Sequence, residues 1–492
     1  MSELTILQIG DLHRGKANRV GNAALLDSIL TDLKYHIPDV LPIDIVVVCG
    51  DIAQGVVARD LAAAEQLVPQ YQEAESFLID LSKELLNGNR ERMIIVPGNH
   101  DISWAHSHCS MREKDINTST EGRRKLIHSL VEESRTPSSA IRWSWEDLKF
   151  MELHERSLYS QRMKYFCDFF NSFYNGTKTY ELETGNQFMV YDYADLAVSV
   201  LGLNSCDCVD HCNLAARLNP DALAGAFMFL KKPQYSERTK IAVWHHGLAG
   251  QPHRTDYLDP LSVQGLIVNR FVLGLHGHQH VPDFMNEIGK FGYNSRMVLV
   301  GAGTLCGAPE ALPTGQMRSY NVLRLDTNSG ELELYPREMK GSPYDSPVWG
   351  KKLLAYNDDY PIHAKLCQAT EGPRKAPESD TVLMKDLSVA EARIGASDYE
   401  GALEILHTMD RTNAMVRSFM VECYVRLHQH KNIVELCIKP TSVREAIYVL
   451  AAADELNDSE LIGQLLDDDF IAAYDDQSLA QYRKKLQRRR TK

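Results

Sequence analysis

The chain has 492 residues, of which 44% are hydrophobic, and a formal net charge of −13 at pH 7. This length is enough for two or three domains with a sizeable core, and the hydrophobic share is ordinary for a globular protein. The lack of an apolar run of 18 residues excludes a membrane span, so no membrane is expected among the partners, and the negative charge counts against broad attraction to a nucleic-acid backbone.

The start of the chain leads directly into a predicted strand. Residues 1–9 lack the basic region and the cleavage site of a secretory signal. The ten cysteines are scattered, and Cys49 and Cys167 lie in apolar segments where reduced thiols commonly pack. These features predict a cytoplasmic protein.

Five short apolar segments in the first 280 residues each end at a cluster of polar side chains. The segments are rich in Val, Ile and Leu without polar alternation, which predicts strands buried on both faces. They are residues 4–9, 43–49, 92–96, 241–244 and 271–275. Because ligands lie beyond the carboxyl ends of strands in open α/β sheets, the five clusters can share one crevice.

The clusters carry the residue types that a two-metal centre needs. Two divalent ions about 3.5 to 4 Å apart clamp phosphate oxygens and share an activated water, which requires oxygen and imidazole ligands and a bridging carboxylate. The candidate ligands are Asp11, His13, Asp51, Asn99, His245 or His246, His278 and His280. The pattern therefore predicts a phosphoesterase centre with two divalent cations. Manganese is the favoured metal, and iron, zinc and magnesium suit the same ligands.

Two residues beside Asn99 are predicted to be catalytic. His100 is the natural remaining group for proton transfer, because its side chain could touch a phosphate oxygen or protonate the leaving oxygen. Asp101 is available to orient His100, and it could equally cap the following turn.

In order and residue type, the clusters resemble the D-x-H, G-D, G-N-H-D, H and G-H-x-H motifs of the calcineurin-like metallophosphoesterases. The resemblance spans residues 4 to about 340 and implies an α/β fold, a four-layer α/β/β/α sandwich with the dimetal site at its edge. It implies one metal held by Asp11, His13, Asp51 and His280, and a second held by Asp51, Asn99, His245 and His278. The family usually ligates through the first His of the fourth motif, which favours His245 over His246.

One departure from the family motifs narrows the substrate class. Ser/Thr phosphoprotein phosphatases of this superfamily carry G-N-H-E, whereas this chain has Gly98-Asn-His-Asp101, which resembles the phosphodiesterases and repair exonucleases. We therefore expect a phosphodiester hydrolase, with a nuclease acting on DNA or RNA as the leading interpretation. The alternatives are a cyclic- or small-nucleotide phosphodiesterase and a non-catalytic phosphate-binding scaffold.

A helical cap insertion is predicted at about residues 103–190, with an amphipathic helix over residues 158–173. A cap that leaves from the metal loop controls which phosphoester reaches the site. Trp104, His211 and His246 are the candidate substrate-contacting residues. His211 lies in a loop with Cys206, Cys208 and Cys212, for which we weigh a structural zinc against a rim of the crevice.

The composition changes after the predicted catalytic domain, residues 1–340. Residues 341–380 have the turn-rich composition of a linker, and residues 381–492 read as helices. Residues 390–406 resemble a tetratricopeptide-type helix pair, with a fainter echo 33 residues further on, and a small helical bundle is the alternative. In either form, these helices are predicted to bind a protein partner or to mediate self-association.

Overall fold

A computed structural model provides the structure of the protein. It describes residues 3–15, 20–116, 119–136, 138–248, 256–289, 296–313, 315–341, 347–354, 359–366, 386–387, 389–390, 393–394, 398–411, 414–440, 443–468, 471, 479, 483–484 and 486–487. Most of the predicted linker at 341–380 and part of the region 381–492 therefore lie outside the described residues. The chain divides into two compact units, Met1–Gly372 and Pro373–Lys492.

The first unit contains a seven-stranded sheet with the order β15-β14-β13-β1-β2-β3, in which β16 also pairs with β14. Strands β1, β2 and β3 are parallel, and β13 runs antiparallel to β1. The strands are β1 (Glu3–Ile9), β2 (Ile45–Val48), β3 (Met93–Ile95), β13 (Ser319–Asp326), β14 (Glu331–Met339), β15 (Trp349–Lys351) and β16 (Ile362–Lys365).

A six-stranded sheet with the order β11-β12-β10-β9-β8-β7 completes the sandwich. Strands β8, β9, β10 and β12 are parallel, whereas β7 and β11 run antiparallel at the two edges. The strands are β7 (Phe188–Tyr193), β8 (Val198–Leu203), β9 (Thr239–Val243), β10 (Phe271–His276), β11 (Asp283–Gly289) and β12 (Arg296–Gly301). The five strands predicted before the polar clusters are thus confirmed as β1, β2, β3, β9 and β10.

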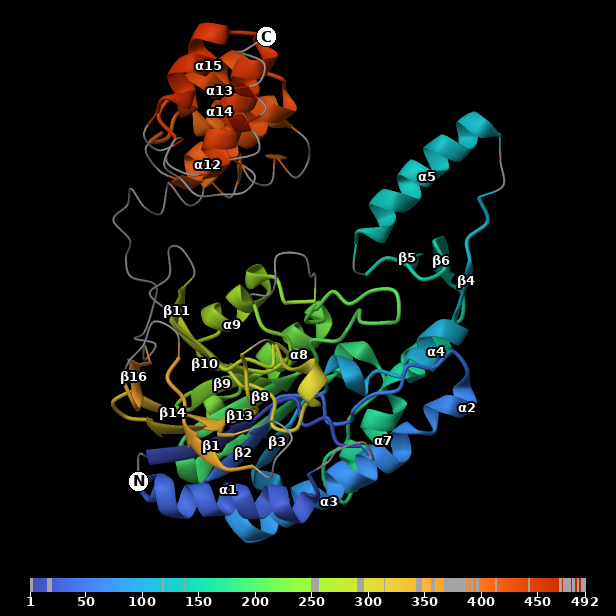
Figure 1. Cartoon of the computed structure of the whole chain (residues 1–492), viewed down its shortest axis with the longest axis vertical. Helices are drawn as coiled ribbons and strands as arrows, with labels where there is room; N and C mark the ends of the chain where they lie inside the picture. Colours follow the sequence, from blue (N-terminus) through green and yellow to red (C-terminus); the bar gives the residue numbers. More distant parts are fainter. Residues whose placement is uncertain are drawn as a thin grey trace. The chain divides into compact units, whose positions relative to one another are not determined.

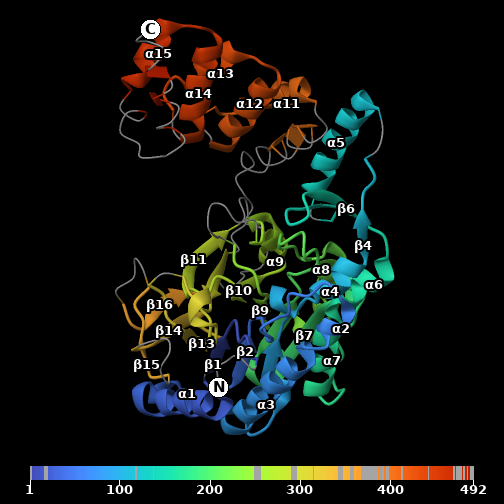
Figure 2. The ribbon, with the colours of Figure 1, turned by 45° about the vertical axis from the view of Figure 1, so that its right-hand side comes forward.

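Alternating side chains along β9 explain how the layers hold together. Ile241 and Val243 belong to the main core between the two sheets, whereas Ala242 and Trp244 belong to a second core with helices on the outer face. Successive side chains of a strand point to opposite faces, so a continuous apolar run can serve both cores. Figures 1 and 2 show α1 and α3 on one side of the paired sheets and α8 and α9 on the other. The predicted four-layer α/β/β/α arrangement is confirmed.

The helices of the first unit frame these sheets and build the insertion. They are α1 (Asn22–His36), α2 (Leu61–Ala64), α3 (Leu67–Leu86), α4 (Trp104–Cys109), α5 (Thr120–Ser134), α6 (Arg156–Ser160), α7 (Lys164–Phe173), α8 (Pro220–Leu230) and α9 (Gln264–Val268). No helix in the described part of the chain combines the length and the apolar character needed to cross a bilayer.

The insertion is less helical than the sequence predicts. Between α4 and α6 the chain forms a three-stranded antiparallel sheet of order β4-β6-β5, with β4 (Met111–Glu113), β5 (Ile141–Ser144) and β6 (Lys149–Leu153). The helix predicted over residues 158–173 is also divided into α6 and α7 by a 3₁₀ turn, Gln161–Met163. The buried guanidinium of Arg162 donates to the backbone oxygens of Val209 and Asp207, which anchors the turn at this point.

The second unit is helical where it is described. Its helices are α11 (Tyr399–Leu406), α12 (Ala414–Arg426), α13 (His430–Cys437), α14 (Val443–Glu455) and α15 (Ser459–Leu466). Each helix packs on the next one in the chain, and two apolar clusters fill the unit. The α-helical C-terminal region is therefore confirmed. A tetratricopeptide repeat remains a prediction beside a plain bundle.

Candidate metal centre

The ends of the predicted strands bring the polar clusters to one place. Ligand atoms of four residues lie within 4.8 Å of one another, and those of three further residues form a second group with the same spacing. The first group is Asp11, His13, Asp51 and His280, and the second is His245, His246 and His278. Side chains from four separate segments therefore form a candidate binuclear metal site.

Asp51 lies between the two groups. Its Oδ2 is 3.6 Å from His13 Nε2, and its Oδ1 is 3.4 Å from His245 Nε2. A carboxylate with one oxygen directed at each cluster has the position that a bridging ligand needs.

The second group includes Asn99 and separates His245 from His246. His245 Nε2 is 3.0 Å from Asn99 Oδ1 and 3.3 Å from His278 Nδ1. His246 instead places Nδ1 2.8 Å from Ser205 Oγ, and its ring is fully buried. The geometry therefore favours His245 over His246 as the residue that faces Asp51 and Asn99.

Three histidines are held through the ring nitrogen that points away from the cluster. His245 Nδ1 lies 2.7 Å from the Cys49 oxygen, His280 Nδ1 lies 3.2 Å from the Ala311 oxygen, and His278 Nε2 lies 3.2 Å from Asp256 Oδ2. An oxygen acceptor keeps the proton on that nitrogen and leaves the lone pair of the other nitrogen for a cation. The donor set thus fits two divalent cations.

The electrostatics of the cluster also fit cations. Burial lowers the pKa of His13 to about 4, so its ring is neutral at pH 7. Burial opposes charge on His245, but Asp51 outweighs it and raises the pKa of His245 to about 9. Burial likewise opposes ionisation of Asp51, whereas His245 and His100 hold its pKa well below the usual range. The buried Asp51 carboxylate is therefore ionised and needs positive charge beside it.

The backbone at the site adopts an uncommon conformation. Asp11, His13, Asp51, His278 and His280 have φ angles of 49°, 44°, 50°, 75° and 56°. Left-handed backbone costs a non-glycine residue about 1 to 3 kcal/mol and persists where the surrounding structure imposes it. Five of the predicted ligands share this strain, so the positions of their side chains at the site are held at a cost in backbone conformational energy.

Two motif glycines allow the loops to approach each other. A Cβ atom on Gly98 would lie 2.1 Å from Asp51 Oδ1, and one on Gly50, where φ is +86°, would lie 2.6 Å from His245 Nδ1. These contacts are too short for any other residue, so both glycines set the distance between the strand ends.

His100 and Asp101 have different environments. The His100 ring is partly exposed, with Nδ1 2.7 Å from the Gln54 oxygen and Nε2 4.0 Å from Asp51 Oδ2. Asp101 is buried, and its carboxylate accepts from the backbone of Gly98, Ile52 and Ala53. It also accepts a 2.9 Å bond from Tyr71 Oη. In the structure the Gln54 oxygen rather than Asp101 holds the His100 ring, and Asp101 caps its own turn and ties two motif loops together, which is the alternative role that the sequence offered for it.

A cleft of about 590 Å³ opens beside the cluster. Its lining includes Asp51, Asn99, His100, His278 and His280. Apolar residues form much of the remaining wall, namely Val56, Val57, Ile102, Trp104, Leu214, Leu312 and Pro313. Trp104 therefore lies where the sequence predicts, and among the described residues of the insertion at 103–190 it is the one that lines the cleft. Among the described lining residues there is no Lys or Arg.

Two predicted substrate contacts are not found in the cleft. His246 is buried behind His278, with 4.4 Å between the ring centroids, and His211 binds Ser107 Oγ at 3.0 Å beside His108. Neither residue lines the cleft, because each is held by a buried hydroxyl group.

The side chains considered as ligands of a structural zinc in the loop of His211 do not converge on one point. Cys206 and Cys208 are directed elsewhere, toward the Pro97 oxygen and Arg217. Asp210, which lies close to His211 and Cys212, already accepts from Arg142 and Tyr159.

Sequence reasoning missed Asp256, Gln54 and Tyr71. Asp256 holds a predicted ligand, Gln54 holds the predicted acid, and Tyr71 bonds to Asp101 from helix α3. Asp256 and Tyr71 lie outside the five clusters, and Gln54 acts through its backbone oxygen, which carries no sequence signal.

The comparison with known protein families agrees with this fold. A model of calcineurin-like phosphoesterases matches residues 4–282, more than half of the chain. No match was found among curated proteins.

Several solved structures are similar to the chain. A dimetal phosphatase from Danio rerio is 9% identical, with 68% of this chain and 96% of that chain covered and a TM-score of 0.32. Vacuolar Protein Sorting 29 from Cryptosporidium parvum is 11% identical, with 72% and 99% covered and a TM-score of 0.26. A phosphopantetheinyl hydrolase from Mycobacterium tuberculosis is 14% identical, with 62% and 90% covered and a TM-score of 0.24.

Proposed function

The chain belongs to the calcineurin-like phosphoesterase family, and we propose that it is a hydrolase that cleaves phosphodiesters with two divalent cations. The observation that carries this proposal is the position of Asp51. One of its oxygens faces His13 and the other faces His245, so the other six predicted ligands surround a single carboxylate.

In the proposed site, one cation lies among Asp11, His13, Asp51 and His280, and the other among Asp51, Asn99, His245 and His278. Two divalent cations supply Lewis acidity to phosphate oxygens and make a water molecule more acidic. Asp51 and Asp11 balance the positive charge, whereas Asn99 contributes a neutral oxygen and does not repel a phosphate. Manganese is the first metal to test, with iron, zinc and magnesium as alternatives, because the ligands are mixed nitrogen and oxygen donors.

His100 is the proposed acid of the reaction. The Gln54 oxygen accepts from Nδ1, so the opposite nitrogen, Nε2, is directed at the cleft. In the imidazolium form, Nε2 donates to a phosphate oxygen or passes its proton to the leaving oxygen. The exposure of the ring lets it meet a substrate in the cleft.

The walls of the cleft favour a small substrate. A polymer places several phosphates near the site, and proteins bind such chains by neutralising phosphates with Lys and Arg. The described lining has neither residue, and instead offers Val57, Trp104 and Leu214 beside the metal ligands. We therefore place a cyclic nucleotide or another small organic phosphodiester first.

A nuclease is the second candidate function. Helix α5 of the insertion exposes Arg123 and Arg124, which could hold a nucleic-acid backbone at a distance from the cleft. Figures 1 and 2 show α5 apart from the two main sheets.

The test is a substrate panel with the full chain and added manganese. The panel contains bis-p-nitrophenyl phosphate, cyclic nucleotides, and single- and double-stranded DNA and RNA. We expect turnover of the small diesters and near-complete loss in Asp51→Asn, with Asp39→Asn, on an exposed surface, as the matched control. Cleavage of polymers alone would select the nuclease. Full activity of Asp51→Asn would reject catalysis here and favour a phosphate-binding scaffold.

For the second unit, we propose partner binding or self-association through its helices. Light scattering of the full chain across a concentration series measures self-association. If the chain is a monomer at all concentrations, self-association is rejected and binding of a different protein is the part of the proposal that remains. The cytoplasmic location is likewise still a prediction.

A further inference from the structure

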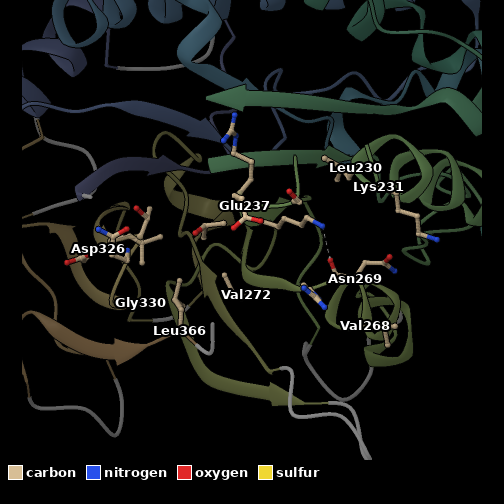
Figure 3. Close-up of a pocket in the computed structure, with 17 residues that line it drawn as sticks. Leu230, Lys231, Glu237, Val268, Asn269, Val272, Asp326, Gly330 and Leu366 are labelled. Atoms are coloured by element: carbon tan, nitrogen blue, oxygen red, sulfur yellow. Dashed lines mark hydrogen bonds between the residues drawn. The ribbon is translucent and has the colours of Figure 1, made fainter. Parts of the chain in front are cut away.

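A second cavity lies at the opposite end of the strands that carry the metal ligands. It has a volume of about 640 Å³ and is lined in part by Lys240, at the start of β9, and by Arg270, just before β10. These strands end before His245 and His278, so the cavity and the metal centre lie at opposite ends of β9 and β10. Figure 3 shows Lys231 on one side of the cavity and the turn from Asp326 to Gly330 on the other.

Cationic side chains outnumber acidic ones in this lining. The four cations are Lys231, Arg238, Lys240 and Arg270, and the two acids are Glu237 and Asp326. Arg238 is already paired with Asp192 at 2.9 Å. Asp326 accepts from the backbone of Asn328 at 2.8 Å and so caps its own turn. The remaining three cations form no ion pair with any residue that the structure describes.

Lys240 is the most informative of these cations. Its side chain is half-buried, and the one hydrogen bond of its ammonium group to a described residue is a long one, 3.5 Å, to the Asn269 oxygen, drawn as a dashed line in Figure 3. Burial lowers the pKa of Lys240, and Arg270 beside it acts in the same direction. A partly buried ammonium next to a second cation is costly unless an anion compensates both.

We propose that this cavity binds a small phosphorylated molecule, whose phosphate group lies between Lys240 and Arg270. The Lys240 ammonium of β9 and the Arg270 guanidinium just before β10 provide charge and several N–H donors, which suits a phosphate with three or more acceptor oxygens. Thr239 also lines the cavity and offers a hydroxyl group, whereas the Ser236 hydroxyl already donates to the Pro233 oxygen. The volume is in the range of small-molecule sites and exceeds what inorganic phosphate needs, so an organic group accompanies the phosphate.

Pyrophosphate binding to the full chain tests the proposal. The parent protein carries Asp51→Asn, which disables the metal centre, and titration calorimetry compares it with the added substitutions Lys240→Met and Arg270→Gln. We expect the affinity to fall about tenfold or more in each, because each removes a charged hydrogen-bond donor. Lys232→Met is the matched control, since Lys232 is next to Lys231 but lies over the Phe229 ring and outside the lining. Its affinity should stay within about twofold of the parent.

A thermal scan provides a second, independent readout. Without pyrophosphate, Lys240→Met should melt at or above the parent temperature, because it removes an uncompensated charge, and pyrophosphate should no longer raise its melting temperature. If Lys240→Met does not fold, Arg270→Gln decides alone, since that side chain is exposed.

Either of two results would overturn the inference. One is no heat of binding at millimolar pyrophosphate. The other is equal affinity in the parent and the two substituted chains, which would identify an adventitious ion only. Neither result bears on the metal centre, because the comparison is made entirely within the Asp51→Asn background.

Discussion

The substitution Gly98→Ala is expected to lower activity by about 10²-fold or more, although it replaces no metal ligand. The added Cβ would lie 2.1 Å from Asp51 Oδ1 and 2.3 Å from the Asp51 backbone nitrogen. Because Cβ atoms do not approach within 3.0 Å of such neighbours, the loop of Asp51 must move by roughly 1 Å. A displacement of that size in a reacting centre costs about 10²-fold in rate, and here it moves the carboxylate that lies between both halves of the site.

The assay has two parts. Turnover of bis-p-nitrophenyl phosphate measures the rate, and elemental analysis of the purified chain measures bound metal. We expect a loss of about 10²-fold or more in kcat together with a lower metal content. Gly21→Ala is the matched control, because its Cβ would meet nothing within 4 Å. A Gly98→Ala chain with normal turnover and two bound metals would refute the reasoning that loop contact sets the position of Asp51.

Three further predictions concern neighbouring groups. His100→Ala should lower kcat by about 10²- to 10⁴-fold while the metal content stays unchanged, since His100 is a proposed acid and not a ligand; a loss of metal would contradict that role. Asp256→Ala should weaken metal binding by about 10- to 100-fold, because Asp256 Oδ2 lies 3.2 Å from His278 Nε2, the ring nitrogen that points away from the cluster. Unchanged affinity in a metal titration would contradict the proposal that Asp256 orients His278. Metal affinity should rise with pH from 7 to about 9, because His245 has a pKa of about 9 when no metal is bound and must release its proton to bind a metal. Calorimetry in buffers of different ionisation enthalpy measures the proton released on metal binding. A metal affinity that does not change with pH would contradict the assignment of His245 as a ligand.

Most of the site could be predicted because its residues follow buried strands. Asp11, Asp51 and Asn99 come directly after short apolar segments, and parallel strands in one sheet end at a common edge. The resemblance to the family motifs then implied how the ligands divide between the two metals. The prediction of His245 over His246 rested on the family pattern, and the distances from His245 to Asn99 and Asp51 support it.

The insertion shows where sequence patterns stop being sufficient. A three-stranded sheet forms between α4 and α6, and its strands are only three to five residues long. Strands this short carry too few side chains to display a period of two. Tertiary packing also decides which part of the insertion reaches the cleft, and Trp104 alone among the described residues of the insertion does so.

The sequence by itself determined the family motifs, the strands that precede them and the change to a helical region near the C-terminus, because each depends on residues that are close together in the chain. Only the tertiary structure decided that Gln54 rather than Asp101 holds His100, and that the cleft wall has no Lys or Arg among its described residues. It also showed the cations that meet around Lys240. These features depend on side chains and backbone oxygens from distant segments, whose approach is set by the packing of two sheets and leaves no periodic trace in the sequence.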